Sequence, residues 1–281
     1  MSVFVQQHHS VCSFTASDSW VILSEIEQSI KRKIEAVGTP LKDWNINIYR
    51  GVLTGYNEAF IISTEKKNEI LENCQTEDER KRTEELIRPI LRGRDIKRYG
   101  YDWAGLYLIA TFPSRHYDIE EYPAVKRHLL SFGIERLEQT GKTHIVNGEK
   151  VKARKKTNNK WFETQDSINY WDDFNKPKLF YADISQQLCF AYCDKTMICN
   201  NTTYFISCHD EATLRYLQMY LNSPIIDWYY RTLSVQLGTA AVRMFSIYVL
   251  KIPIPSDNNN IYNAYHLSKN EIEFIESLQI Q

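Results

Sequence analysis

Glu84 to Tyr101, EELIRPILRGRDIKRYGY, is a basic segment that leads into an apolar strand predicted from Leu106 to Phe112. Eight Lys or Arg residues and three acids lie between residues 80 and 100, a local charge of +5. Pro89 and Gly93 interrupt any helix, so these cations are expected on turns and short extended pieces. A basic loop beside a rigid sheet suits a polyanionic partner. The alternative is a solvated surface turn whose charges pair with one another.

A second basic segment runs from Lys142 to Lys160, with seven Lys or Arg residues and one acid, a local charge of +6. The net charge of the whole chain is only −1, so the positive charge is concentrated in two places. Such a one-sided footprint favours a nucleic-acid partner over other partners. The segment has little apolar content and is predicted to be a mobile surface excursion.

Length and composition describe an ordinary globular protein. A chain of 281 residues is long enough for one large or two modest domains. It contains no apolar run of about 18 residues, so a membrane span is not expected. The first 13 residues lack the pattern of a secretory signal. The six cysteines lack metal-site spacing, and free core thiols in a reducing cytoplasm are the expectation.

Apolar periodicity predicts a mixture of helices and short strands. A first helix begins near Trp20, with Leu23, Ile26, Ile30 and Ile34 on one face, and stops at Gly38. Further helices are predicted over 64–87, 123–139, 211–222 and 225–233, and a final helix begins at the capping box Ser268-x-x-Glu271. Strands are predicted over 44–49, 106–112, 178–182, 188–193, 197–199 and 203–207, with an edge or exit segment at 248–255.

A search for catalytic centres finds no convincing motif. The chain lacks a Pro-Pro pair of the kind that adenine or cytosine amino-methylation requires, a P-loop, a dinucleotide fingerprint and a Gly-x-Ser-x-Gly elbow. Glu120, Glu149 and Lys150 give only fragments of a metal-nuclease pattern. We therefore predict no catalytic residue and no metal site in this chain.

Five motifs occur in an order that resembles a known family. They are GVLTGYNEAFII (51–62), RPILRGRDIKRY (88–99), KPKLFY (176–181), YLNS (220–223) and KIPIP (251–255). Together they resemble the TaqI-like C-terminal specificity domain, the target recognition domain of type II, type IIG-like, restriction–modification enzymes. The helix that precedes Gly38 also resembles the junction that follows the methyltransferase domain in those enzymes.

The resemblance implies a fold, a partner and a domain division. The fold implied is α+β, a mixed, mostly antiparallel β recognition domain with flanking helices, similar to type I specificity-subunit target recognition domains. The partners implied are double-stranded DNA and the methyltransferase or nuclease domain of the same enzyme, and S-adenosylmethionine and Mg²⁺ are expected only there. We expect a junction segment over 1–41, the target recognition domain over 42–256 and a C-terminal linker and helix over 257–281.

Candidate DNA contacts come from the residues themselves, because base-reading residues vary between such domains. Arginine can fork onto a guanine edge, lysine can contact phosphate, and asparagine can pair with adenine. The set is Arg92, Arg94, Lys97, Arg98, Lys152, Arg154, Lys155, Lys156, Asn158, Asn159, Lys160 and Arg243. For the first four, a self-paired turn built around Asp95 is an equal alternative. Arg243 could instead lie at the edge of the core, and Asn57 is expected to cap a turn.

Two other classes of function compete with DNA recognition. A protein-interaction scaffold predicts exposed apolar stripes at Ile26 with Ile30 and at Ile272 with Ile275 on the terminal helices. A divergent metal nuclease predicts Mg²⁺-dependent nicking that carboxylate substitution abolishes.

Overall fold

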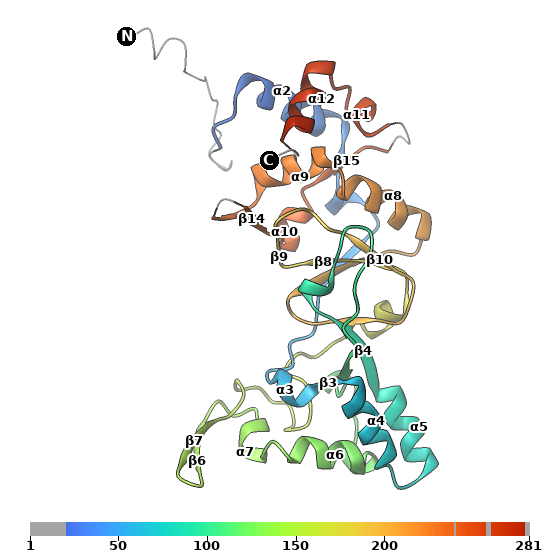
Figure 1. The fold of residues 1–281 in the computed structure, drawn as a ribbon, viewed down its shortest axis with the longest axis vertical. Coiled ribbons are helices and arrows are strands. Elements are labelled where there is room, and N and C mark those ends of the chain that lie inside the picture. Colours follow the sequence, from blue (N-terminus) through green and yellow to red (C-terminus); the bar gives the residue numbers. More distant parts are fainter. Residues whose placement is uncertain (1–20, 239, 257–259, 279–281) are drawn as a thin grey trace.

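The computed structural model describes residues 21–238, 240–256 and 260–278. Figure 1 shows an elongated molecule with a helical end, a central sheet and a second lobe. The helical end contains α2 (Glu25–Val37), α8 (Glu211–Leu221), α9 (Pro224–Leu233), α10 (Ser246–Val249), α11 (Ile261–Ala264) and α12 (Lys269–Ser277). The opposite lobe contains α3 (Asn57–Phe60), α4 (Thr64–Glu72), α5 (Glu77–Leu86), α6 (Pro123–Leu130) and α7 (Ile134–Leu137).

The central sheet has the strand order β10-β8-β12-β2 and is antiparallel throughout. Its strands are β2 (Asn47–Arg50), β8 (Lys178–Ala182), β10 (Ala191–Cys193) and β12 (Thr203–Ser207). Successive side chains point to opposite faces, and both faces are covered. Leu179 and Tyr181 pack with the helical end, whereas Phe180 packs with the other lobe. The predicted strands at 178–182 and 203–207 are confirmed residue for residue.

A second sheet organises the other lobe, in the order β11-β4-β5-β3. It contains β3 (Ile61–Ser63), β4 (Ile87–Leu91), β5 (Leu106–Ile109) and β11 (Ile198–Cys199). Only β11 with β4 is parallel among these pairs, and it joins residues distant in the sequence, Ile198 to Ile90. The predicted α+β, mostly antiparallel fold is confirmed. The helix predicted over 123–139 is divided in two, because Gly133 adopts a left-handed backbone (φ 83°).

Small sheets and turns complete the structure. β1 (Thr39–Pro40) pairs with β15 (Pro253–Ile254). The end of the edge or exit segment predicted over 248–255 is therefore a strand, whereas its first two residues belong to α10. β9 (Ile184–Ser185), β13 (Gln236–Leu237) and β14 (Ala241–Arg243) form a three-stranded sheet, and β6 (Thr143–Val146) with β7 (Glu149–Lys152) forms a hairpin. The 3₁₀ turns are η1 (Leu41–Asp43), η2 (Gly93–Asp95), η3 (Pro113–Arg115), η4 (Ile119–Glu121) and η5 (Trp171–Asn175).

The terminal helices are packed, not exposed. Ile30 of α2 and Ile275 of α12 are fully buried in the helical end, and Ile26 and Ile272 pack against the same core. The scaffold hypothesis predicts exposed apolar stripes on these helices. That prediction is wrong, because α2 packs against β15, α12 packs against α9, and both contribute to the core of the helical end. Trp20, which was predicted on the first helix, lies outside the described residues.

Glu271 joins these two helices through a buried hydrogen-bond cluster. Its carboxylate accepts from Lys33 Nζ at 2.6 Å, from the Ser29 hydroxyl at 2.7 Å and from the Ser268 backbone N–H at 2.7 Å. Burial alone would raise the pKa of Glu271, but these donors lower it to about 2. The predicted capping box is confirmed, and it also contributes to tertiary structure.

This cluster predicts acid sensitivity of the helical end. A carboxyl with a folded pKa near 2 and an ordinary value of 4.5 stabilises the fold fully above pH 4.5 and loses that contribution as the pH falls toward 2. Glu271→Gln should lower the free energy of unfolding at pH 7 by about 2 kcal/mol. The variant should also make this free energy depend less on pH between pH 5 and 2. Urea denaturation at several pH values measures both effects. Glu273→Gln, on the exposed face of α12, is the matched control and should change little; equal effects of the two variants would refute the role of Glu271.

Candidate nucleic-acid interface

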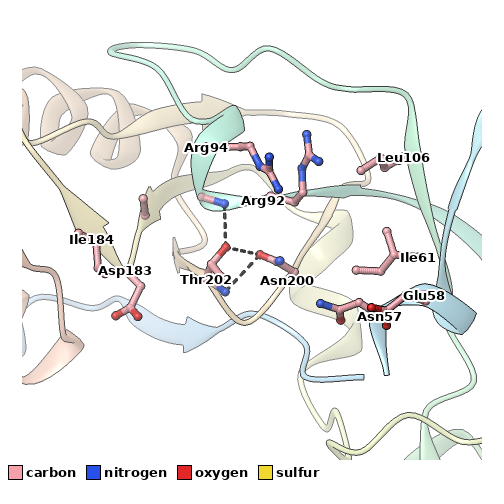
Figure 2. Close-up of a pocket in the computed structure, with 12 residues that line it drawn as sticks. Asn57, Glu58, Ile61, Arg92, Arg94, Leu106, Asp183, Ile184, Asn200 and Thr202 are labelled. Carbon is pink, nitrogen blue, oxygen red and sulfur yellow. Dashed lines mark hydrogen bonds between the residues drawn. The ribbon is translucent and has the colours of Figure 1, made fainter. Parts of the chain in front are cut away.

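A cavity of about 710 Å³ lies at the end of the central sheet, where β8 leaves it and β12 enters it. Six segments form its wall: α3, β3, the η2 turn, β5, the connection from β8 into β9, and the turn between β11 and β12. Figure 2 shows the side chains that line it. They are Asn57, Glu58, Ile61, Arg92, Gly93, Arg94, Leu106, Ala182, Asp183, Ile184, Asn200 and Thr202.

The parallel pairing of β11 with β4 brings these distant segments together. Asn200 N donates to Leu91 O at 2.9 Å, and the Thr202 hydroxyl accepts from Gly93 N at 2.9 Å. A Cβ atom on Gly93 would lie 2.7 Å from the Thr202 carbonyl oxygen, so only glycine allows this approach. The motif glycine at 51 has the same function, because its Cβ would lie 2.1 Å from Asn200 O.

The η2 turn holds Arg92 in a fixed orientation toward the cavity. Asp95, only 4% exposed, accepts from Arg92 Nε at 3.1 Å and from Nη2 at 2.8 Å, and also from the Arg92 backbone N–H. The hydrogen bonds to Asp95 raise the pKa of Arg92. The sequence left two alternatives, a self-paired turn and a DNA contact. The structure contains the pairing, and it places the same arginine on the cavity wall.

The other cations of this turn are less constrained. Arg94 lines the cavity, and in the described part of the chain neither Arg94 nor Lys97 takes part in an ion pair. Lys97 Nζ donates only to the carbonyl oxygen of Arg94, at 3.4 Å. Arg98 is half-buried, and its Nε lacks a hydrogen-bond partner among the described residues. Arg94 and Lys97 are therefore free to meet a polyanion.

A second cavity of about 550 Å³ continues the first and shares Gly93, Ala182 and Ile184 with it. It adds the exposed amides of Gln186 and Gln187. We call the two cavities together the sheet-end groove. Arg243 on β14 pairs with Asp183 of the groove wall, Nη1 to Oδ2 at 3.1 Å. Arg243 does not line either cavity, but its partly exposed guanidinium adjoins the groove through this ion pair with Asp183.

Several groove residues escaped prediction. Asp183, Gln186, Gln187, Asn200 and Thr202 carry no local motif, and only the tertiary pairing of strands gathers them. Asn57 was expected to cap a turn, and its Oδ1 does accept from the Thr54 hydroxyl at 2.7 Å. The same side chain also lines the groove.

The first part of the second basic segment forms a hairpin, which was not predicted from the sequence. β6 and β7 pair from Thr143 with Lys152 to Val146 with Glu149. Asn147 and Gly148 form the turn, with φ values of 50° and 85°. Asn-Gly between alternating residues is a strong hairpin signal, because both central residues of this turn need positive φ. That signal was available in the sequence.

Arg154 was predicted to contact DNA and is instead a buried anchor for this hairpin. It is 2% exposed. Its guanidinium donates to the carbonyl oxygens of Leu137, Thr54, Glu163 and Trp161 at 2.7–2.9 Å. Burial lowers the pKa of Arg154 to about 10, so the group is charged at neutral pH. We remove Arg154 from the candidate DNA contacts because no phosphate can reach it in this fold.

Asn159 has a similar supporting role. Its amide nitrogen donates to the carbonyl oxygens of Thr164 and Gln165, at 3.2 and 3.0 Å. Pairing with adenine needs both the oxygen and the nitrogen of the amide, so the predicted role for Asn159 is inconsistent with this geometry. Its neighbour Asn158 is exposed.

The remaining candidates form an exposed basic arm. They are Lys152, Lys155, Lys156 and Lys160, all exposed, and none takes part in an ion pair within the described ranges. We use the name basic arm for the hairpin and these four lysines. In the view of Figure 1, β14, α3 and the hairpin all lie along the left-hand side of the molecule. The groove and the arm can thus face one extended partner.

Three further findings concern the nuclease alternative and the expectations drawn from composition. The fragments of a nuclease pattern are on separate elements: Glu120 on η4 pairs with Lys126, whereas Glu149 and Lys150 are on β7. Five cysteines lie in the described residues as free thiols, three of them buried, and Cys12 lies outside those residues. None of the helices in the described part of the chain has the length and apolar character to cross a membrane.

The described fold thus combines a polar groove at the end of a sheet with exposed lysines that form no ion pair among the described residues. The model of the TaqI-like C-terminal specificity domain matches residues 88–254. The chain belongs to this family.

One curated protein and two solved structures are similar to the chain. The chain is 23% identical to type II methyltransferase M.PaeR7I of Pseudomonas aeruginosa over 241 residues. The matched region covers 85% of this chain and 37% of that protein. The type IIG restriction endonuclease BpuSI has a similar fold, with a TM-score of 0.52 and 12% identity over 90% of this chain and 27% of that one. The type IIL restriction-modification enzyme MmeI, solved in complex with DNA, has a TM-score of 0.47 and 12% identity, and covers 86% of this chain and 29% of MmeI.

Proposed function

We propose that this chain recognises a short sequence in double-stranded DNA as the specificity part of a restriction–modification enzyme. The observation that carries the proposal is the sheet-end groove. Its wall combines arginine, asparagine and glutamine side chains, the groups that pair with base edges. The family membership supports the same conclusion.

The basic arm and the sheet-end groove contribute to DNA binding in different ways. Unpaired lysines on the basic arm supply the sequence-independent attraction to phosphates, which releases counterions and depends on salt. The groove holds oriented donors and acceptors, and those groups distinguish base pairs. In this division, the arm sets affinity and the groove sets specificity.

The match to the methyltransferase relative spans only 37% of the length of that protein. We propose a type II enzyme in which an adenine methyltransferase domain, and in some members a nuclease domain, acts on the DNA that this part selects. S-adenosylmethionine and Mg²⁺ would serve those catalytic domains, in the cytoplasm. We propose residues 42–256 as the recognition unit, with 1–41 and 257–281 as its flanking segments.

Selection from a randomised duplex pool tests the proposal. The chain is incubated with the pool at two salt concentrations, and the retained duplexes are sequenced. One asymmetric motif should be enriched at both concentrations. Retention that disappears at the higher salt and enriches no motif would reduce the site to a basic surface and would contradict sequence recognition.

A further inference from the structure

We infer that the sheet-end groove reads two guanines through two arginines, Arg92 and Arg243, each oriented by an aspartate. This inference rests on the proposed DNA recognition and deepens it. It names the bases that two particular side chains select, and it gives Asp95 and Asp183 the role of positioning residues.

Arg92 is built to present one defined edge. Its Nε and Nη2 donate to the two oxygens of Asp95, so the side edge of the guanidinium is occupied. The end edge, formed by Nη1 and the second Nη2 proton, has no acceptor among the described residues. That edge carries two parallel N–H donors, which match the O6 and N7 acceptors of guanine in the major groove.

In Arg243 the aspartate binds the other terminal nitrogen of the guanidinium. Its Nη1 donates to Asp183 Oδ2, whose side chain is 13% exposed and lines the groove. The Nε and Nη2 edge is then left for a ligand, and the Arg243 side chain is 34% exposed. Two arginines from distant parts of the chain, one directly before η2 and one on β14, thus each pair with an aspartate at or beside one groove, Arg92 through two side-chain bonds and Arg243 through one.

Base reading fits these arginines better than phosphate binding does. A phosphate contact needs charge but no fixed orientation, and a neighbouring carboxylate reduces the net attraction to a polyanion. A guanidinium already held in one orientation loses less side-chain entropy when it forms a bidentate bond. Arg94, which lies between Arg92 and Asp95 in sequence and has no such carboxylate, is the natural phosphate contact of the same turn.

The test uses the full chain and the duplex enriched by pool selection. In that duplex, each guanine is replaced in turn by 7-deazaguanine, which lacks the N7 acceptor. We expect about 10-fold weaker binding at two positions and little change at the others. Because the protein is unaltered, this measurement does not depend on any variant folding.

Lysine variants then assign each position. Arg92→Lys and Arg243→Lys keep the charge but lose the planar fork, so each should weaken binding about 10- to 100-fold and become insensitive to 7-deazaguanine at its own position. Arg94→Lys is the matched control and should retain sensitivity at both positions. Thermal unfolding of the variants separates a folding defect from a loss of base reading, because a merely structural role would not remove sensitivity at one base.

The outcomes distinguish the inference from the proposed function. A pool that enriches no motif contradicts DNA recognition itself. An enriched motif whose binding is unaffected by every 7-deazaguanine substitution leaves DNA recognition intact and overturns guanine reading. Loss of sensitivity in Arg94→Lys, with retention in the other two variants, would overturn the assignment of residues.

Discussion

Replacing Arg154 with methionine is expected to lower the free energy of unfolding by about 4 kcal/mol, among the largest effects of any single substitution in this chain. The methylenes of methionine fill part of the same space, but the carbonyl oxygens of Leu137, Thr54 and Trp161 lose the donor that Arg154 supplies. The Glu163 carbonyl loses one of its two side-chain donors and keeps the other, Gln139 Nε2. Each buried unsatisfied carbonyl costs about 1 kcal/mol or more. Urea denaturation followed by circular dichroism measures the change.

Two variants sharpen this prediction. Lys155→Met, at the exposed neighbouring position, should change stability by less than about 0.5 kcal/mol. Arg154→Lys keeps the charge but cannot reach four acceptors, so its free energy of unfolding should lie between those of Arg154→Met and the wild type. If Arg154→Met were as stable as Lys155→Met, the hairpin anchor described above would be incorrect.

Removing three charges from the basic arm is expected to weaken DNA binding on the order of 100-fold at about 0.1 M salt. The variant is Lys152→Ala, Lys155→Ala and Lys156→Ala in one chain. The dependence of log K on log salt should become shallower by about three, one for each lost phosphate contact. Titrations of the enriched duplex at several salt concentrations give the slope, and the enriched motif itself should stay unchanged.

A charge-matched control identifies the face that binds. Lys42, Lys251 and Lys269 are exposed at the helical end, and their combined replacement by alanine removes the same charge. This control should leave both affinity and slope nearly unchanged, because these residues lie outside the proposed interface. An equal loss in both triple variants would mean that overall charge, not the basic arm, governs binding.

Local patterns predict the elements of this fold well and their assembly poorly. The strands at 178–182 and 203–207 follow from apolar runs bounded by turn signals, and the last helix follows from its capping box. The second basic segment was misinterpreted because a count of charges does not distinguish an exposed lysine from a buried arginine. Only its contacts with four carbonyl groups identify Arg154 as part of the core.

The groove marks a second limit of sequence interpretation. Arg92 and Arg94 were named from their charge, but Asp183, Asn200 and Thr202 lie about 100 residues away and carry no motif. Asn200 and Thr202 reach the groove through the parallel pairing of two short strands, β4 and β11, and Asp183 reaches it through the pairing of β8 with β12. No local periodicity predicts a pairing of this kind, since its partners are selected by packing of the whole lobe.

The way in which Arg154 holds the hairpin has a consequence for protein engineering. Its acceptors are backbone oxygens, which every amino acid supplies, so the anchor places few demands on the side chains at 54, 137, 161 and 163. The hairpin between residues 143 and 152 can therefore vary in sequence while the contacts of Arg154 stay the same. We expect hairpins of other sequence or charge to be tolerated there while Arg154 is kept, so that the strength of the proposed DNA binding can be changed without changing the groove.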